Sequence, residues 1–166
     1  MADEPQASQQ PEQFWVSVVL QRRPSKNRWL SHSWRVTGVV VNSQFNKQLS
    51  NPIQIRSTND EADFLWHGLS VRLYKDEAED YYHNLMAPEP HLYVITRTNE
   101  QGMPEPFLVS ASFDEAHAYM EGDEDAHPVP IPPELYGWIE QFVLMHYAPE
   151  PRKKRKRNNW KSDHER

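Results

Sequence analysis

Apolar and polar residues alternate along two segments near the start of the chain. Apolar side chains stand at every second position of residues 14–20, which places them on one face of a β-strand. Residues 34–41 repeat the pattern with β-branched side chains on both faces. We expect these segments to be neighbouring antiparallel strands. Residues 21–33 between them are predicted to form a long hairpin loop, because they are too few for a crossover helix.

Later segments carry strand patterns as well. Residues 69–74 alternate between apolar and polar side chains, and residues 91–97 and 106–112 are short apolar-rich runs bounded by turn residues. The isoleucines within residues 53–55 indicate one further short strand. Alternating prolines keep residues 128–132 extended ahead of the last predicted helix.

Two short helices are indicated by their ends. Residues 76–86 have apolar side chains at helical spacing, and Asp76 is predicted to cap this helix. Ser112 and Glu115 form the capping box Ser-x-x-Glu at the start of a second helix. We expect that helix to end at Gly122 in the left-handed conformation that favours glycine.

The last helix is predicted over residues 133–146, where Pro133 occupies the first turn and apolar residues follow an amphipathic stripe. The order of the elements predicts a single α+β domain with a mainly antiparallel sheet of five or six strands and two or three helices. This domain is expected to span residues 13–148. The polar residues 1–12 are predicted to form a disordered segment, and residues 149–166 a disordered basic tail.

Charge is distributed unevenly along the chain. The formal net charge is −6, from 18 Lys and Arg against 24 Asp and Glu. Eight of the basic residues and only two of the acidic residues follow Pro151. Positions 1–151 therefore contain 10 basic and 22 acidic residues. Because an acidic body repels phosphate, any contact with nucleic acid would depend on the tail. Six consecutive cations there are candidate partner-binding residues: Arg152, Lys153, Lys154, Arg155, Lys156 and Arg157.

The composition argues against several kinds of chemistry. The chain has no cysteine, which excludes disulfides, thiolate metal sites, cysteine nucleophiles and persulfide transfer. Its five glycines are too far apart to form a phosphate-binding loop. Carboxylates cluster in the predicted first turns of helices, where they complement the helix dipole. We therefore expect a protein that is not an enzyme and that binds no cofactor.

Targeting signals are not evident in the sequence. The longest apolar runs are far shorter than the roughly 20 residues that a membrane span requires. The first residues lack the basic and apolar regions of a signal peptide. We expect a cytoplasmic protein without a membrane partner.

One segment leaves a metal site open as an alternative. His117 and His127 bracket an acidic loop that could supply nitrogen and oxygen ligands. The eight histidines form none of the short spacings that are typical of metal centres. A solvated loop with surface imidazoles is the favoured interpretation.

Cations and tryptophans gather around the predicted hairpin loop. Arginine and aromatic side chains are the residue types that binding hot spots and stacking surfaces use. The alternative is that the tryptophans cover the end of the sheet while the cations remain in water. The candidate partner-binding residues of this region are Arg22, Arg23, Trp29, Trp34 and Arg35, with Lys26 and Arg28 between them.

Several of these segments, in this order and spacing, resemble a bacterial family named domain of unknown function 3305. The resemblance covers about residues 14–157 and includes Arg22-Arg23, Trp29 and Trp34-Arg35. The longer matching segments are LSVRLYKDEAEDYYHNL, LYVITR, PFLVSASFDEAHAYMEG, PVPIPPELYGWIEQFV and the terminal KRKR.

Members of that family are often named after a molybdopterin-guanine dinucleotide biosynthesis protein, and they resemble products encoded beside formate dehydrogenases. The biosynthetic name implies a nucleotidyltransferase with a glycine-rich nucleotide loop, whereas residues 1–51 here contain one glycine, Gly38. The resemblance therefore implies a non-enzymatic accessory protein that binds a protein partner, a molybdoenzyme subunit or a fellow accessory protein, in the maturation of a molybdenum-dependent oxidoreductase. The alternative is a nucleic-acid-binding module that uses the basic tail.

Overall fold

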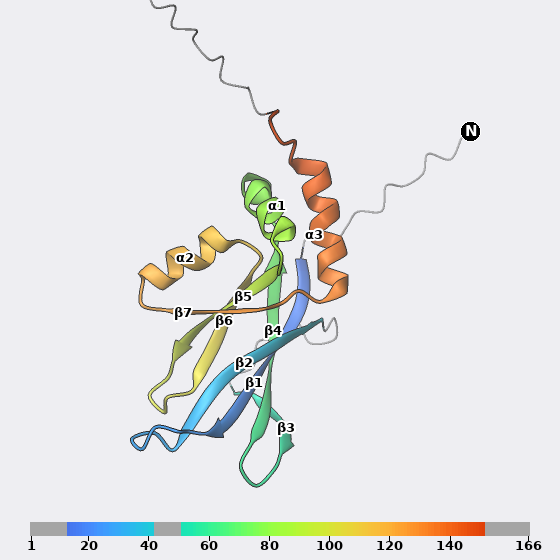
Figure 1. The fold of residues 1–166 in the computed structure, drawn as a ribbon. Helices are drawn as coiled ribbons and strands as arrows, with labels where there is room; N and C mark the ends of the chain where they lie inside the picture. The colour runs from blue at the N-terminus through green and yellow to red at the C-terminus, as the bar shows by residue number, and fades with distance from the viewer. Residues whose placement is uncertain (1–12, 42–50, 152–166) are drawn as a thin grey trace, which may run out of the picture.

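The computed structural model describes residues 13–41 and 51–151, which form two antiparallel sheets and three α-helices (Figure 1). The predicted terminal segment 1–12 and the six tail cations at 152–157 lie outside the described residues. The α+β class and the antiparallel pairing that the sequence predicts are confirmed.

Each sheet is built from strands that pair with antiparallel neighbours. Sheet A has the order β2-β1-β4-β3, and sheet B has the order β6-β5-β7. The strands of sheet A are β1 (Gln13–Pro24), β2 (His32–Val41), β3 (Ile53–Ser57) and β4 (Ala62–Arg72). The strands of sheet B are β5 (His91–Thr98), β6 (Pro104–Ser110) and β7 (Asp125–Pro130).

The two sheets enclose one hydrophobic core between them. They contact each other on both sides, β4 against β6 and β2 against β7. Alternate residues of β1 point inward, and Val16, Val18 and Leu20 are fully buried. Leu92 and Val94 of β5 belong to the same cluster of buried side chains. Each such aliphatic side chain contributes about 1.5–3 kcal/mol by leaving water, so this core holds the two sheets together.

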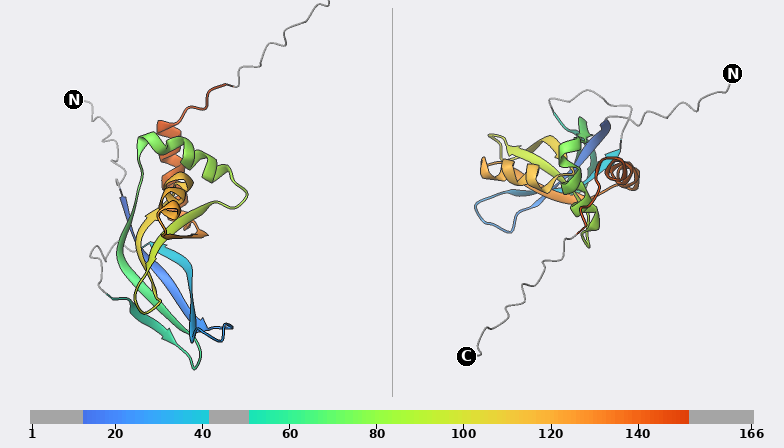
Figure 2. Two further views of the ribbon diagram at one scale, coloured as in Figure 1. Left: turned by 90° about the vertical axis from the view of Figure 1, so that its left-hand side faces the viewer. Right: turned by 90° about the horizontal axis from the view of Figure 1, so that it is seen from above.

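Helices close one end of this core and one outer face (Figures 1 and 2). A 3-10 turn, η1 (Lys75–Glu77), leads into α1 (Ala78–Met86), which packs against α3 (Pro133–His146). The ring of Trp138 on α3 lies 4.7 Å from the ring of Phe14 at the start of β1. The third helix, α2 (Phe113–Glu121), covers the outer face of sheet B, where Phe113 contacts Tyr93 with 5.9 Å between ring centroids.

The predicted helix ends are partly right. The Ser112 side chain accepts a hydrogen bond from the Glu115 backbone N–H at 3.0 Å, and Pro133 stands in the first turn of α3. Gly122 was the expected left-handed residue, but its φ is −94° and the left-handed position is Asp123, with a φ of 69°. Aspartate tolerates this conformation better than most residues.

The predicted Asp76 cap is wrong. The chain enters α1 through the 3-10 turn, and no side chain caps either segment. Instead, the Tyr81 hydroxyl accepts a hydrogen bond from the Tyr74 backbone N–H at 3.1 Å and donates one to Glu77 at 2.8 Å. A side chain from the second turn of the helix therefore holds its entry in place.

Three strands extend further than predicted, and one is added. Strand β1 continues to Pro24, and strand β2 begins at His32. The predicted loop 21–33 is therefore reduced to residues 25–31. Strand β4 begins at Ala62, seven residues before the predicted segment. The extended, proline-rich segment before α3 pairs with β5 as β7, which makes seven strands among the described residues.

Candidate functional site

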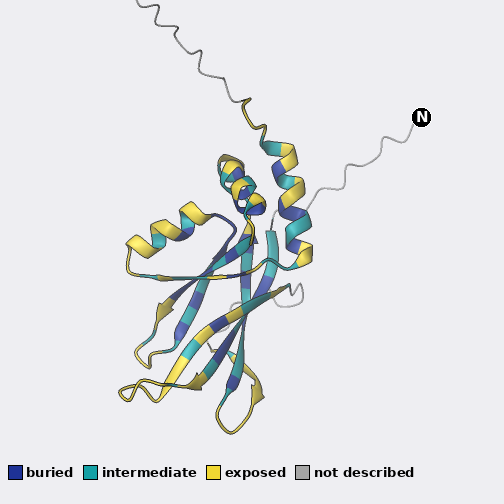
Figure 3. Cartoon of the chain, viewed as in Figure 1, coloured by how far each residue is buried: buried dark blue, intermediate teal, exposed yellow. Residues whose placement is uncertain are grey.

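Sheet A projects beyond the core at the end of the molecule opposite α1 and α3 (Figure 1). We call this part the distal end; it comprises residues 21–35 of the β1–β2 hairpin and residues 56–64 around the β3–β4 turn. Exposed residues predominate at its tips (Figure 3). The predicted cations and tryptophans before the tail all lie here.

The strand register assigns the distal residues to two faces. Leu20, which faces the core, pairs with Val36 on β2 and with Phe64 on β4. Arg22 stands two residues further along β1 and pairs with Trp34. Because side chains alternate along a strand, Arg22 and Trp34 continue the core-facing side, which we call the inner face. Arg23 therefore points to the outer face.

An ion-pair network occupies the outer face. Arg23 Nε lies 3.3 Å from Glu61 Oε1, and Arg56 Nη2 lies 3.5 Å from Glu61 Oε2. Arg56 also forms a two-pronged contact with Asp63, with Nη2 3.2 Å from Oδ1. The hydrogen bond from Arg56 lowers the pKa of Asp63, and Asp63 raises the pKa of Arg56. The charges of Arg23 and Arg56 are thus balanced within the sheet.

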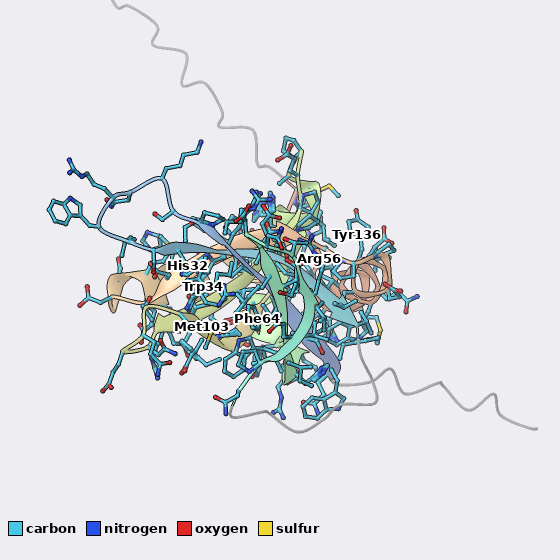
Figure 4. All side chains as sticks on the ribbon, turned by 90° about the horizontal axis from the view of Figure 1, so that it is seen from below. His32, Trp34, Arg56, Phe64, Met103 and Tyr136 are labelled. Carbon is cyan, nitrogen blue, oxygen red and sulfur yellow. The ribbon has the colours of Figure 1, made fainter. Side chains whose placement is uncertain are left out.

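The inner face combines one cation with apolar side chains. The guanidinium carbon of Arg22 lies 5.6 Å from the centroid of the Phe64 ring, and the Trp34 ring lies 5.4 Å from the same ring. Met103, from the β5–β6 turn, also packs against the core. Figure 4, seen from the distal side, shows Trp34, Phe64 and Met103 gathered at this end, with His32 beside Trp34.

Arg22 differs from its neighbours in its hydrogen bonding. Its Nε atom is buried and has no hydrogen-bond partner among the described residues. A buried polar group without a partner costs free energy, and the cost is larger when the group is charged. Stacking on Phe64 recovers part of it.

The tip of the β1–β2 hairpin presents an exposed indole. Trp29 is 85% exposed and Leu30 is 58% exposed. The loop that carries them has defined hydrogen bonds: Asn27 Oδ1 accepts from the Trp29 backbone N–H at 3.1 Å, and Ser25 Oγ accepts from the Asn27 N–H at 3.0 Å. The Arg28 guanidinium carbon lies 5.9 Å from the Trp29 ring centroid.

The structure thus divides the residues that the sequence grouped together. Arg22 and Trp34 share the inner face, Arg23 and Arg35 lie on the outer face, and Trp29 stands at the tip. Sequence reasoning missed three residues of this region, Phe64, Met103 and Glu61. No local pattern marks them, because Phe64 contacts β1 and β2, Glu61 contacts β1 and β3, and Met103 packs against the core.

The histidines of the acidic segment are engaged separately. His127 Nε2 lies 2.9 Å from Thr96 Oγ1, and burial lowers the pKa of His127 while nearby Asp125 opposes that shift. His117 Nδ1 lies 3.7 Å from Glu121 Oε1 on the same helix. Within residues 13–41 and 51–151, no group of three potential metal ligands comes together.

A groove of about 280 Å³ runs between β4 and β6. Arg72, Tyr74 and Glu115 are among its lining residues. The main polar groups are already engaged, because Arg72 Nε donates to Gln13 at 2.9 Å and Glu115 accepts a hydrogen bond from Ser110. The distal end is therefore the stronger candidate for a binding site.

The fold and the site define the chain as an α+β protein in which one sheet projects beyond the core and carries cations at its end. The chain belongs to the family described as "Protein of unknown function (DUF3305)", whose model matches residues 15–156. No curated protein and no solved structure matches the chain. None of the helices in the described part of the chain has the length and apolar character needed to cross a membrane.

Proposed function

We propose that the protein is a non-enzymatic accessory protein that binds a protein partner through the distal end of sheet A. The partner is a molybdoenzyme subunit or a fellow accessory protein, in the maturation of a molybdenum-dependent oxidoreductase of the formate dehydrogenase type. The family resemblance supports the biological setting. The observation that carries the binding role is Trp29, exposed to 85% on a hydrogen-bonded tip.

The energetic argument rests on how aromatic side chains behave at interfaces. Tryptophan and arginine are over-represented among the few residues that dominate binding energy, and truncation of such a residue costs about 2 kcal/mol or more. The Asn27 and Ser25 hydrogen bonds hold the backbone of the loop that carries Trp29, so little backbone conformational entropy is lost when the tip docks.

The test is affinity capture from a native extract of the bacterium that makes the protein, followed by mass spectrometry. Full-length wild type, Trp29→Ala and Leu144→Ala are compared. Leu144 is a matched control, since it is 77% exposed but lies on α3, at the other end of the molecule. Wild type and Leu144→Ala are expected to recover a molybdoenzyme subunit or accessory factor, and Trp29→Ala is expected to lose it. Recovery of no such protein by wild type contradicts the proposal.

A nucleic-acid-binding module is the second candidate, and the six consecutive cations at 152–157 favour it. If all six bound phosphates of duplex DNA, the logarithm of affinity would fall with the logarithm of salt at a slope of about −5. Truncation after Pro151 would then abolish binding. Absence of duplex binding at low salt removes this candidate.

A further inference from the structure

Charge is segregated within the part of the chain that precedes the tail. No Asp or Glu occurs in residues 13–59, which contain seven Lys and Arg. Residues 60–151 contain 19 Asp and Glu but only three Lys and Arg. The first range supplies β1, β2 and β3, whereas the second supplies all three helices and all of sheet B.

This segregation has a spatial consequence. Six described cations lie at the distal end, and the acidic residues there are Asp60, Glu61 and Asp63 of the β3–β4 turn and β4. The helical end and sheet B carry the remaining described carboxylates, including Glu100 and Glu105 on either side of Met103. Among the described residues, the distal end is therefore positive and the helical end negative. A charge distribution of this kind favours the approach of a negatively charged partner to the distal end over its approach to sheet B.

Arg22 is the cation at which such a partner gains most. Three other arginines of the described structure already have carboxylate partners: Arg23 has Glu61, Arg56 has Asp63, and Arg97 has Glu124 at 3.0 Å. Arg22 lies on the inner face with a buried Nε atom that lacks an acceptor within the described part of the chain. Its guanidinium is stacked on Phe64, which restricts its orientation before any ligand arrives.

We propose that Arg22 binds a carboxylate of an acidic segment in the partner protein, and that Trp34, Phe64 and Met103 form the apolar floor beside it. This inference rests on the proposed function and names the chemistry of the partner. A carboxylate can accept two parallel N–H bonds from a single guanidinium. An apolar residue next to that carboxylate would pack on the Trp34 and Met103 side chains.

A protein segment fits this surface better than a nucleic acid does. Phosphate backbones bind along a track of unpaired cations. At the distal end, Glu61 and Asp63 neutralise Arg23 and Arg56 on the outer face, which interrupts such a track. A half-buried arginine beside an apolar floor is suited to one carboxylate with an apolar neighbour.

The experiment uses the purified full-length protein and two synthetic peptides, Ac-EEEFEE-NH2 and its uncharged counterpart Ac-QQQFQQ-NH2. The arginine Nε–H signals are followed by ¹H–¹⁵N NMR at about 20 mM salt, where surface electrostatics are weakly screened. The Arg22 signal is expected to shift with the glutamate peptide and to stay in place with the glutamine peptide. The Arg23 signal, which reports a group already paired with Glu61, is expected to move little.

Arg22→Gln and Arg23→Gln provide the matched variants. They remove the same charge from adjacent positions on opposite faces of β1. Arg22→Gln is expected to raise the dissociation constant of the glutamate peptide about tenfold or more, and Arg23→Gln about twofold or less. The wild-type titration carries the test even if a variant fails to fold.

Three outcomes overturn the inference. They are equal weakening by the two variants, no binding of the glutamate peptide by wild type, and a larger Arg22 shift with a 12-base-pair duplex than with the peptide. Each is distinguishable from failure of the proposed function, which is decided by capture with the Trp29 variant. If that capture succeeds while the glutamate peptide leaves the Arg22 signal unchanged, the protein-binding function is supported and the carboxylate site at Arg22 is refuted.

Discussion

Arg22 and Arg23 are adjacent in the sequence but lie on opposite faces of β1, and only one of them has a carboxylate partner. Arg23 Nε is 3.3 Å from Glu61 Oε1, whereas Arg22 Nε is buried with no partner among the residues that the structure describes. Two residues of the same type therefore have different roles. Arg23 is part of the ion-pair network of the sheet, and Arg22 is the arginine to which we assign a ligand.

The first prediction concerns the stability of this arrangement. Replacing Arg22 with Met keeps a long apolar side chain on Phe64 and removes the buried unpartnered Nε–H. We expect Arg22→Met to raise the free energy of unfolding by about 1 kcal/mol, measured by urea denaturation. Arg23→Met breaks an exposed ion pair and is expected to lower it by about 0–1 kcal/mol. A clear loss of stability in Arg22→Met would mean that Arg22 has a structural role.

The second prediction concerns Asn84, a buried side chain that joins α1 to the start of β5 and to the residue after β6. Its Nδ2 atom donates to the backbone oxygens of His91 at 2.7 Å and Ala111 at 2.8 Å, and its Oδ1 atom accepts from the His91 N–H at 3.1 Å. Asn84→Ala leaves three backbone groups without these partners. We expect it to lower the free energy of unfolding by about 2–4 kcal/mol.

The control for Asn84 is Asn84→Asp, which preserves shape and the acceptor but removes both donors. It is expected to be at least as destabilising as Asn84→Ala, because a carboxylate would face two carbonyl oxygens. A change below about 0.5 kcal/mol in either variant would contradict the assigned role of Asn84.

The third prediction is a pH dependence from His127. Burial lowers the pKa of His127 below its ordinary value of 6.5 in the folded state. The folded protein therefore binds this proton less readily than the unfolded chain, and stability contributed by His127 is complete above about pH 6.5 and lost as pH falls through the lower folded pKa. His127→Gln is expected to remove this part of the pH dependence, measured by urea denaturation between pH 5 and 8. An unchanged profile in His127→Gln would refute the assignment.

The fourth prediction separates folding from binding at the hairpin tip. Trp29 makes little contact with the rest of the described structure, since it is 85% exposed. We expect Trp29→Ala to change the free energy of unfolding by less than about 0.5 kcal/mol. A larger loss of stability, measured by thermal or urea denaturation, would mean that Trp29 contributes to folding and would argue against a role in binding alone.

Much of the fold could be predicted from the sequence because the core strands alternate with period two. Strand β7 is the informative exception. Pro128 and Pro130 lack the N–H groups that a central strand needs, so the sequence indicates only an extended segment. In the structure Pro128 pairs with Tyr93 and Pro130 with His91 of β5. The two prolines are two residues apart, so their backbone nitrogens point to the same side of the strand. Their ring nitrogens therefore face away from the ladder, as an edge strand permits.

The site was predicted less well, for a reason that Arg22 illustrates. The strand pattern of β1 is obscured where a charged residue takes a core-facing position, so residues 21–33 look like a loop. In the structure β1 extends through Pro24 and β2 begins at His32. Because side chains alternate between the two faces of β1, Arg22 and Arg23 lie on opposite faces. The contribution of Met103 comes from the other sheet and depends on tertiary packing, which no local pattern encodes.

The most direct measurement is the affinity of the captured and purified partner for wild-type protein and for Trp29→Ala, with Leu144→Ala as the control. If the distal end is the binding surface, Trp29→Ala should raise the dissociation constant about thirtyfold or more, and Leu144→Ala should leave it within about twofold. Equal affinities for wild type and Trp29→Ala would contradict the account.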